Sequence, residues 1–349
     1  MTGTEKHRNF LLGFIALGLL LFLLQVGQPI IVLIIFALFL AILLQPLASF
    51  LDRFLPNWLS IALVVVFIGI LLTGIALLFY AQARSVAEKA PEYTERFQSV
   101  MDWAVATSEK QGYEFEGLQN SDAVTSVLAM VASGLESIFG FAGKTLLVLI
   151  MTIFMLIEAP SLKLKIERAF GDDQSLRVRT SIESMTLQIQ RYVTTKTLVS
   201  LVTGVLTGCI THALEVDFPV IWGAIAFQLN FIPHVGSMIA VVPPSLLALV
   251  QYDSPNTAIA TFLILSSVQF SIGNIIEPRI MGQTLELSPV VVFISMMFWG
   301  WFWGAAGIML AVPLTAAVRI VCLHVDSLRP FAVILGNPQA VHESSPSTG

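Results

Sequence analysis

Long apolar segments, separated by short polar or proline-containing turns, occupy most of the chain. A helix needs about 20 apolar residues to cross a hydrocarbon core of about 30 Å. We expect the first apolar segment to be retained, because no small-residue cleavage site of a signal peptide follows it. Six segments come close to the required length and are predicted to be spanning helices: 9–27, 29–50, 58–82, 141–158, 196–213 and 257–276.

Two further apolar segments are interrupted near their midpoints. Residues 219–250 contain Asn230 and then Pro233–Gly236, and residues 289–320 contain the glycine-rich run Trp299–Gly304. Each half has about 12–17 residues, roughly 18–25 Å of helix, which is short of a full crossing. Since lipid cannot satisfy backbone groups freed at such a break, it must face protein or water. We therefore predict two re-entrant helical hairpins; the alternative is two unusually long or paired spans.

The charged residues predict which side of the membrane each loop occupies. Segment 159–196 carries seven basic residues, whereas segment 83–143 carries nine acidic residues against four basic ones. By the positive-inside rule the first segment is cytoplasmic and the second external. Both termini are then cytoplasmic, Glu215 and Asp217 lie outside, and the two hairpins have opposite orientations.

Composition agrees with an all-α integral membrane protein. Hydrophobic residues make up 56% of the 349 and charged residues 12%, and the mean hydropathy is +0.83. Soluble domains carry about 25% charged residues. A net charge of −5 gives no basic face for nucleic acid. The chain has no His-Glu-x-x-His motif or nucleotide-binding glycine loop, and its two cysteines lack metal-ligand spacing, so we expect no enzyme activity, cofactor or metal site.

The pattern divides the chain into a scaffold and a transport region. The first four spans contain almost no polar side chain, whereas residues 196–320 contain many. Gly204 and Gly208, with Thr203 and Thr207, give the 196–213 helix a small, close-packing face. The predicted parts are scaffold helices 1–82, external amphipathic helices 83–140, membrane helix 141–158, cytoplasmic amphipathic helices 159–195, transport region 196–320 and cytoplasmic tail 321–349.

Polar residues at membrane depth are costly and are candidates for function. Broken helix ends near the midplane also offer free N–H and carbonyl groups to a solute. The predicted substrate-binding residues are Gln228, Asn230, Pro233, His234, Gly236, Ser237, Gln269 and Asn274. The predicted gate or coupling residues are Glu277, Pro278, Arg279, Gly282, Gly300, Gly304 and Pro313.

Several of these residues have a structural alternative. Asn230 could instead satisfy the carbonyls freed around Pro233, and His234 could be a structural hydrogen-bonding group in a wet loop. Glu277 and Arg279 could form an interface pair with snorkelling side chains.

Three motifs resemble the autoinducer-2 exporter family of bacterial inner-membrane proteins, closest to its quorum-signal exporter subgroup. They are Leu229–Ser237 followed by Pro243-Pro244, then Ile276–Gly282, and the run from Ser288 through Phe298–Trp301 to Leu314. The resemblance implies eight membrane segments including re-entrant hairpins, a homo-oligomer (a pentamer in the characterised branch) and export of a small solute. Some members are credited with autoinducer-2 and others with sodium–proton antiport. His234 departs from the Tyr or Asn expected at its position.

The favoured function is export of a small polar solute, autoinducer-2 above all, by alternating access of the C-terminal half. No Asp lies in any predicted span, whereas a cation antiporter typically places a carboxylate at the membrane centre. The alternatives are a monovalent cation/proton antiporter, with Glu277 or His234 carrying the proton, and a non-transporting membrane scaffold.

Overall fold

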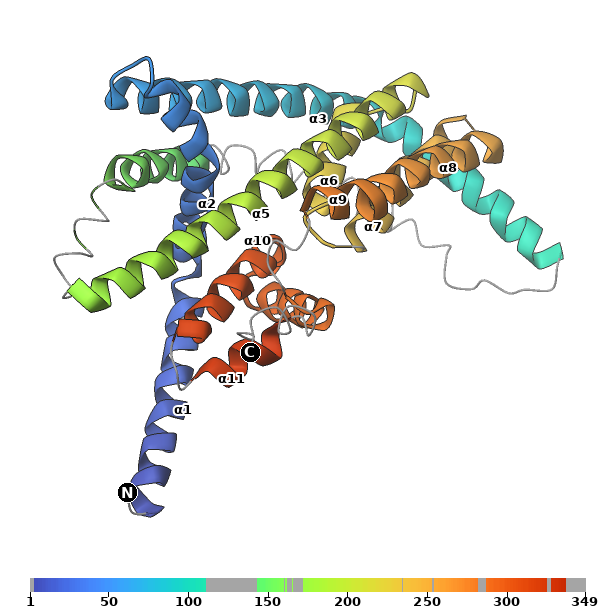
Figure 1. The fold of residues 1–349 in the computed structure, drawn as a ribbon. Helices are drawn as coiled ribbons and strands as arrows, with labels where there is room; N and C mark the ends of the chain where they lie inside the picture. Colours follow the sequence, from blue (N-terminus) through green and yellow to red (C-terminus); the bar gives the residue numbers. More distant parts are fainter. Residues whose placement is uncertain are drawn as a thin grey trace, which may run out of the picture. The chain divides into compact units, whose positions relative to one another are not determined.

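The computed structural model describes residues 3–110, 143–159, 161, 165, 172–233, 235–252, 254–281, 287–324 and 328–336 (Figure 1). These residues form helices, with one isolated bridge between Leu287 and Gly336. The helices are α1 (Gly3–Val26), α2 (Gln28–Leu51), α3 (Asn57–Lys110), a helix over 143–159, α5 (Asp172–Ala213), α6 (Pro219–Leu229), α7 (Val235–Tyr252), α8 (Pro255–Ser271), the π-helix η1 (Ile272–Ile276), α9 (Glu277–Met281), α10 (Pro289–His324) and α11 (Arg329–Leu335). The all-α prediction is confirmed for this part of the chain.

The helices belong to two compact units. Unit 1 comprises Met1–Ala62, Leu146–Gln190 and Leu285–Gly349, and unit 2 comprises Leu63–Thr145 and Arg191–Thr284. Each unit therefore combines segments of the predicted scaffold with segments of the predicted transport region. The six domain boundaries proposed from the sequence stay a prediction.

Among the residues that the structure describes, six helices are long and apolar enough to cross a membrane: Gln28–Leu51, Asn57–Val86, Thr186–Ala213, Val235–Tyr252, Pro255–Met281 and Pro289–Leu323. Four of them contain predicted spans. The other two contain predicted hairpin arms, because α7 continues through Pro243 and Pro244 to 18 residues and α10 includes both arms of its hairpin. The apolar part of α1, Leu11–Val26, is shorter than these six.

The break predicted at Asn230–Gly236 is a reversal of the chain between two helices. α6 ends at Leu229 and α7 begins at Val235. At the far end of α7, Gln251 Nε2 donates to the Glu215 carbonyl over 2.8 Å, and the Asp217 N–H donates to Gln251 Oε1 over 2.9 Å. The end of α7 thus lies beside the start of α6, and the two arms are antiparallel.

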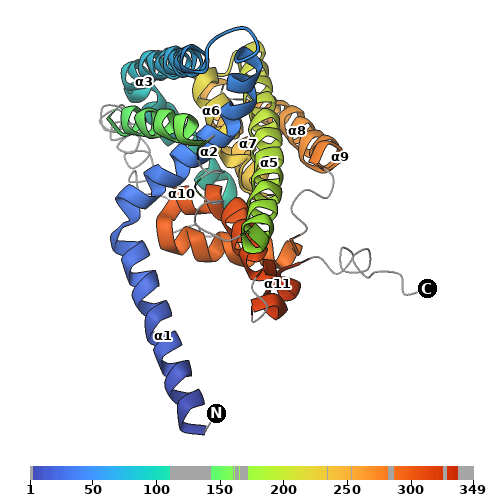
Figure 2. The same ribbon diagram turned by 60° about the vertical axis from the view of Figure 1, so that its left-hand side comes forward.

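The glycine-rich break in α10 is a second reversal, centred on Gly304, which has φ 64° and ψ −144°. Trp299 Nε1 donates to Thr315 Oγ1 over 3.2 Å, although 16 residues of straight helix would separate them by about 24 Å. The two arms therefore run side by side (Figure 2). The re-entrant character of both hairpins stays a prediction.

Two glycines permit the hairpin arms to approach each other. A Cβ on Gly236 would lie 1.7 Å from the Leu229 carbonyl oxygen, and a Cβ on Gly307 would lie 1.8 Å from the Trp299 carbonyl oxygen. A larger residue would overlap backbone at either position.

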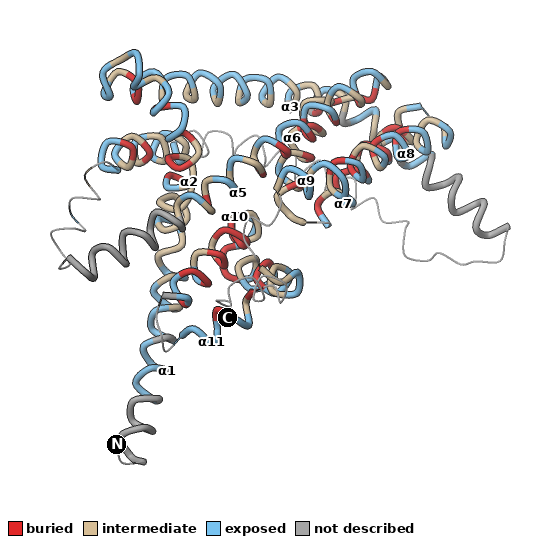
Figure 3. Tube along the Cα trace, viewed as in Figure 1, coloured by how far each residue is buried: buried red, intermediate tan, exposed pale blue. Residues whose placement is uncertain are grey.

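The long helix α3 carries many apolar side chains that no part of the described chain covers. Figure 3 shows exposed positions alternating with intermediate ones along α3, and its exposed side chains include Phe67, Ile70 and Leu77. Such apolar exposure over a long helix is expected where lipid, rather than protein, covers the surface.

Candidate functional site

The membrane half of α5 packs closely against α6 in unit 2. A Cβ on Gly204 would lie 2.7 Å from the Gly223 carbonyl oxygen, and a Cβ on Gly208 would lie 3.2 Å from the Pro219 carbonyl oxygen. The small, close-packing face predicted for α5 is therefore confirmed, with α6 as its partner.

Asn230 connects the end of α6 to α5 through a side-chain hydrogen bond. Its Nδ2 donates to Ser200 Oγ over 3.0 Å, and the two residues are 5% and 0% exposed. The bond uses one of the two N–H donors of the Asn230 side chain. It leaves the acceptor Oδ1 unused by this contact. Asn230 is thus a buried amide at the turn of the hairpin, as the sequence predicted, held by a hydroxyl that the sequence reasoning did not pair with it.

The α8–η1–α9 segment carries the other predicted polar residues of unit 2. Gln269 is 5% exposed, and its Oε1 has no hydrogen-bond partner. Asn274 is exposed on η1 and donates to the Phe270 carbonyl over 3.2 Å. π-helical turns inside α-helices are frequent at functional sites. The π-helix beside Gln269 therefore makes this segment a candidate part of the site.

Glu277 bonds to Lys196 of α5 rather than to Arg279. Lys196 Nζ donates to Glu277 Oε1, with side chains 2% and 17% exposed. Arg279, two residues after Glu277, is exposed. Residues two apart on a helix do not share a face, which is why Glu277 and Arg279 do not form the ion pair given above as their structural alternative.

Lys196 and Glu277 form one end of an antiparallel arrangement. At the other end, Tyr252 Oη donates to the Glu215 carbonyl over 3.0 Å, just after α5 and just before α8. The α8–α9 segment is therefore tied to α5 at Glu277, and the end of α7 that precedes α8 is tied to the loop after α5, about 27 Å away along α5.

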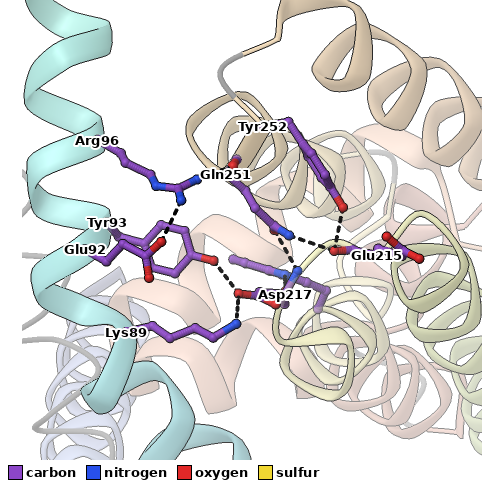
Figure 4. A network of polar contacts seen from close by, with 9 residues as sticks. Lys89, Glu92, Tyr93, Arg96, Glu215, Asp217, Gln251 and Tyr252 are labelled. Atoms are coloured by element: carbon purple, nitrogen blue, oxygen red, sulfur yellow. Dashed lines mark hydrogen bonds and ion pairs between the residues drawn. The ribbon is translucent and has the colours of Figure 1, made fainter.

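A polar network surrounds the loop between α5 and α6 (Figure 4). Asp217 accepts hydrogen bonds from Lys89 Nζ and Tyr93 Oη of α3, and Arg96 donates to the Gln251 carbonyl. Burial, followed by the bond to Asp217, raises the pKa of Tyr93 above its ordinary value. All these residues belong to segments assigned to the external side from the sequence.

The loop inside this network has an unusual backbone. Glu215 has φ 55° and Phe218 has φ 63°, a left-handed conformation that is uncommon for residues other than glycine. Bonds from Gln251, Tyr252 and Tyr93 to this loop offset that cost. The sequence reasoning missed this network; the nearest signal was the density of charged residues on α3 beyond the span.

The remaining predicted site residues are distributed over both units. In unit 2, Gln228 and Pro278 are exposed, Pro233 and Ser237 are half-buried, and Gly236 is buried. In unit 1, a Cβ on Gly300 would lie 2.7 Å from Ile308 Cγ1 of the opposite arm, and Gly304 is the hinge of the hairpin. Pro313 is buried in the second arm. His234 and Gly282 lie outside the described residues.

Metal chemistry has no candidate in the part of the chain that the structure describes. No group of three or more His, Cys, Asp or Glu residues is arranged there to hold an ion. Cys209 is exposed and Cys322 is buried, and both are free.

Comparisons with known proteins agree on transport. The model of the AI-2E family of transporters matches residues 11–326. A putative transport protein of Haemophilus influenzae is 29% identical over 338 residues, 95% of this chain and 97% of that protein. The AI-2 transport protein TqsA of Escherichia coli K12 is 29% identical over 338 residues, covering 93% and 95% of the two chains.

A third relative is named for a different activity. The sodium-lithium/proton antiporter of Halobacillus andaensis is 26% identical over 305 residues, covering 82% of this chain and 86% of that protein. The family match spans nearly the whole chain and includes both helix reversals and the Lys196–Glu277 pair. The chain is a multi-pass membrane protein that belongs to the AI-2E family of transporters.

Proposed function

We propose that this transporter exports a small, uncharged polar solute, with autoinducer-2 (AI-2) as the favoured solute. The observation that carries the proposal is the chemistry of the buried polar groups in unit 2. Asn230 and Gln269 offer buried amides, and Gln269 lies on a helix long enough to span a membrane. Such groups bind hydroxyls without a fixed counter-charge.

Charge in this region is already compensated. Glu277, at the end of the α8–α9 segment, is paired with Lys196, so neither residue is left as an isolated buried charge. An ionic solute would need a free counter-charge at membrane depth. A neutral, hydroxyl-rich solute such as AI-2 makes no such demand.

The proposed mechanism is alternating access. Broken helices place N–H and carbonyl groups near the midplane, where transporters of other folds bind solutes. The hairpins α6–α7 and α10 supply two such breaks. Movement of the C-terminal half, by sliding or by rocking, would expose the site to one side at a time. Residues Glu277, Pro278, Arg279, Gly282, Gly300, Gly304 and Pro313 are the proposed gate or coupling residues.

The proposed setting is a homo-oligomer in the bacterial inner membrane with both termini in the cytoplasm. The orientation rests on the excess of basic residues in segment 159–196. The bonds from Lys89 and Tyr93 to Asp217 support the assignment of their segments to one common side.

The second candidate is monovalent cation/proton antiport, favoured by the Halobacillus andaensis relative. In this mechanism Glu277 or His234 would carry the proton. Protonation of Glu277 would remove its ion pair with Lys196 and leave a buried ammonium group, which gives this mechanism a defined conformational trigger.

The test measures AI-2 efflux from proteoliposomes loaded with AI-2. Replacing both Asn230 and Asn274 by Ala should abolish the flux. Ser200→Ala removes the same hydrogen bond from Asn230 but leaves its amide, and Asn256→Ala removes an exposed asparagine of α8; both should retain flux. Normal efflux in the double variant would contradict the site, and equal loss in Ser200→Ala would assign Asn230 a structural role.

A further inference from the structure

A row of hydroxyl residues follows one buried face of α5. Ser200, Thr203, Thr207 and Thr211 are each 0–1% exposed and recur at spacings of three or four residues above Lys196. This spacing places them on a single face of the helix. The glycine face that packs on α6 lies beside this row.

Thr207 departs from the pattern of its neighbours. Thr203 Oγ1 donates to the Val199 carbonyl over 2.8 Å, and Thr211 Oγ1 donates to the Thr207 carbonyl over 2.9 Å. Ser200 Oγ accepts a hydrogen bond from Asn230 Nδ2. The Thr207 hydroxyl, although 99% buried, has no partner. A threonine in a helix usually bonds the carbonyl four residues earlier, so the free hydroxyl needs an explanation.

A second buried oxygen without a partner lies on α8, in the same unit. Gln269 Oε1 is buried on α8. Gln269 lies about 12 Å along the α8–α9 segment from Glu277. Thr207 lies about 16 Å along α5 from Lys196. Because Lys196 bonds to Glu277, both oxygens lie on the same side of that ion pair, at nearby depths.

We propose that the Thr207 hydroxyl and the Gln269 carbonyl are direct contacts for an uncharged, hydroxyl-bearing solute; this inference rests on the proposed function. Gln269 Oε1 accepts hydrogen bonds only, and a threonine hydroxyl both donates and accepts. Together they suit a ligand that carries hydroxyl groups. Two buried polar atoms left without partners would otherwise destabilise the fold, and a solute or the water it replaces satisfies them.

The kinetic test uses proteoliposomes loaded with a series of AI-2 concentrations. Thr207→Val and Gln269→Leu should each raise the KM for efflux about two- to tenfold, the value of one neutral hydrogen bond, with a maximal rate close to that of the unmodified protein. The matched controls are Thr203→Val and Thr261→Val, whose hydroxyls already bond within their own helices; their KM should not change.

Thermal stability separates a binding role from a packing defect. Replacing an unpartnered buried hydroxyl by a methyl group of the same shape is neutral or stabilising. Thr207→Val should therefore unfold at the same or a higher temperature while its KM rises. Unchanged KM together with higher stability would overturn the proposal, because Thr207 would then be only an imperfectly packed residue.

Thiol labelling keeps the proposal testable even if AI-2 does not cross. In a background carrying Cys209→Ala and Cys322→Ala, Thr207→Cys should react with a small, charged methanethiosulfonate faster than Val205→Cys on the exposed apolar face. AI-2 should slow this reaction. Equal labelling of the two positions would overturn the proposal, and protection by sodium instead of AI-2 would overturn the ligand class. Rapid, AI-2-protected labelling without AI-2 efflux would contradict export and leave the contact standing.

Discussion

Lys196 of α5 forms a buried ion pair with Glu277 of α9, and this pair closes one end of the α5–α8 arrangement. The partners are 81 residues apart in the chain. α8 and η1 connect directly to Glu277. The pair therefore fixes the position of Gln269 along the helix axis relative to the row of hydroxyl residues Ser200–Thr211 on α5.

Removing one partner of this pair should destabilise the protein. Lys196→Met or Glu277→Gln should lower the free energy of unfolding by about 3–5 kcal/mol, because the other group is left buried without its partner. The measurement is unfolding in detergent by titration with sodium dodecyl sulfate. The double variant Lys196→Met/Glu277→Gln should lose less than the sum of the two single variants. Arg279→Gln, which changes an exposed side chain, should have little effect. Strict additivity would show that the two residues do not interact.

The bonds to Asp217, which lies outside the predicted spans, should make a measurable contribution to the free energy of unfolding. Asp217 is 23% exposed and accepts bonds from Lys89 and Tyr93. Asp217→Asn should lower the free energy of unfolding by about 1–3 kcal/mol, the range for hydrogen bonds to charged groups. Glu88→Gln removes the exposed pair with Arg84 and should cost about 0.5 kcal/mol or less. Similar effects of the two substitutions would argue against a special role for Asp217.

Tyr93 should contribute to stability at alkaline pH. Burial and its bond to Asp217 raise its pKa in the folded protein, whereas in the unfolded chain it ionises near pH 10. The folded state therefore retains a proton that the unfolded state loses, so this contribution is present below about pH 10 and declines as pH rises further. Melting temperatures from pH 8 to 11 should fall less steeply in Tyr93→Phe than in the unmodified protein. An identical slope would show that Tyr93 ionises equally in both states.

The tight reversals should tolerate no side chain at their two closest glycines. Gly236→Ala and Gly307→Ala place a Cβ within 2 Å of a backbone oxygen and should cost about 3 kcal/mol or more. Gly273→Ala, where nothing lies within 4 Å, should be neutral or raise stability by up to about 1 kcal/mol. Yield and melting temperature of the three variants provide the comparison. Full stability of Gly236→Ala would mean that the α6–α7 turn is wider than described.

The elements and their breaks were largely predictable from local sequence. Apolar runs of helical length predicted the long helices, and Pro233 and the glycines around Gly304 predicted the reversals, because proline and glycine act through the local backbone. The length of α7 was not predicted: Pro243 and Pro244 lie inside the helix, yet it continues to Tyr252.

Which side chains form hydrogen bonds or ion pairs with each other was much less predictable from the sequence. Lys196 entered the sequence reasoning only as one basic charge among seven, and its pairing with Glu277 depends on the register of α5 against α9. The bond between Tyr93 and Asp217 spans 124 residues and likewise depends on tertiary packing. Asn230 and Gln269 were predicted as buried polar groups from their depth in apolar segments, but the unpartnered state of Gln269 and Thr207 requires the structure.

The measurement that tests the central claim most directly follows two signals in proteoliposomes of the purified, folded protein. One set is loaded with AI-2 and the other with a pH-sensitive dye under a sodium gradient. Export of a neutral polar solute predicts AI-2 efflux without a sodium-dependent pH change. A sodium-driven pH change without AI-2 movement would contradict the account. It would favour cation/proton antiport, with Glu277 or His234 as the proton carrier.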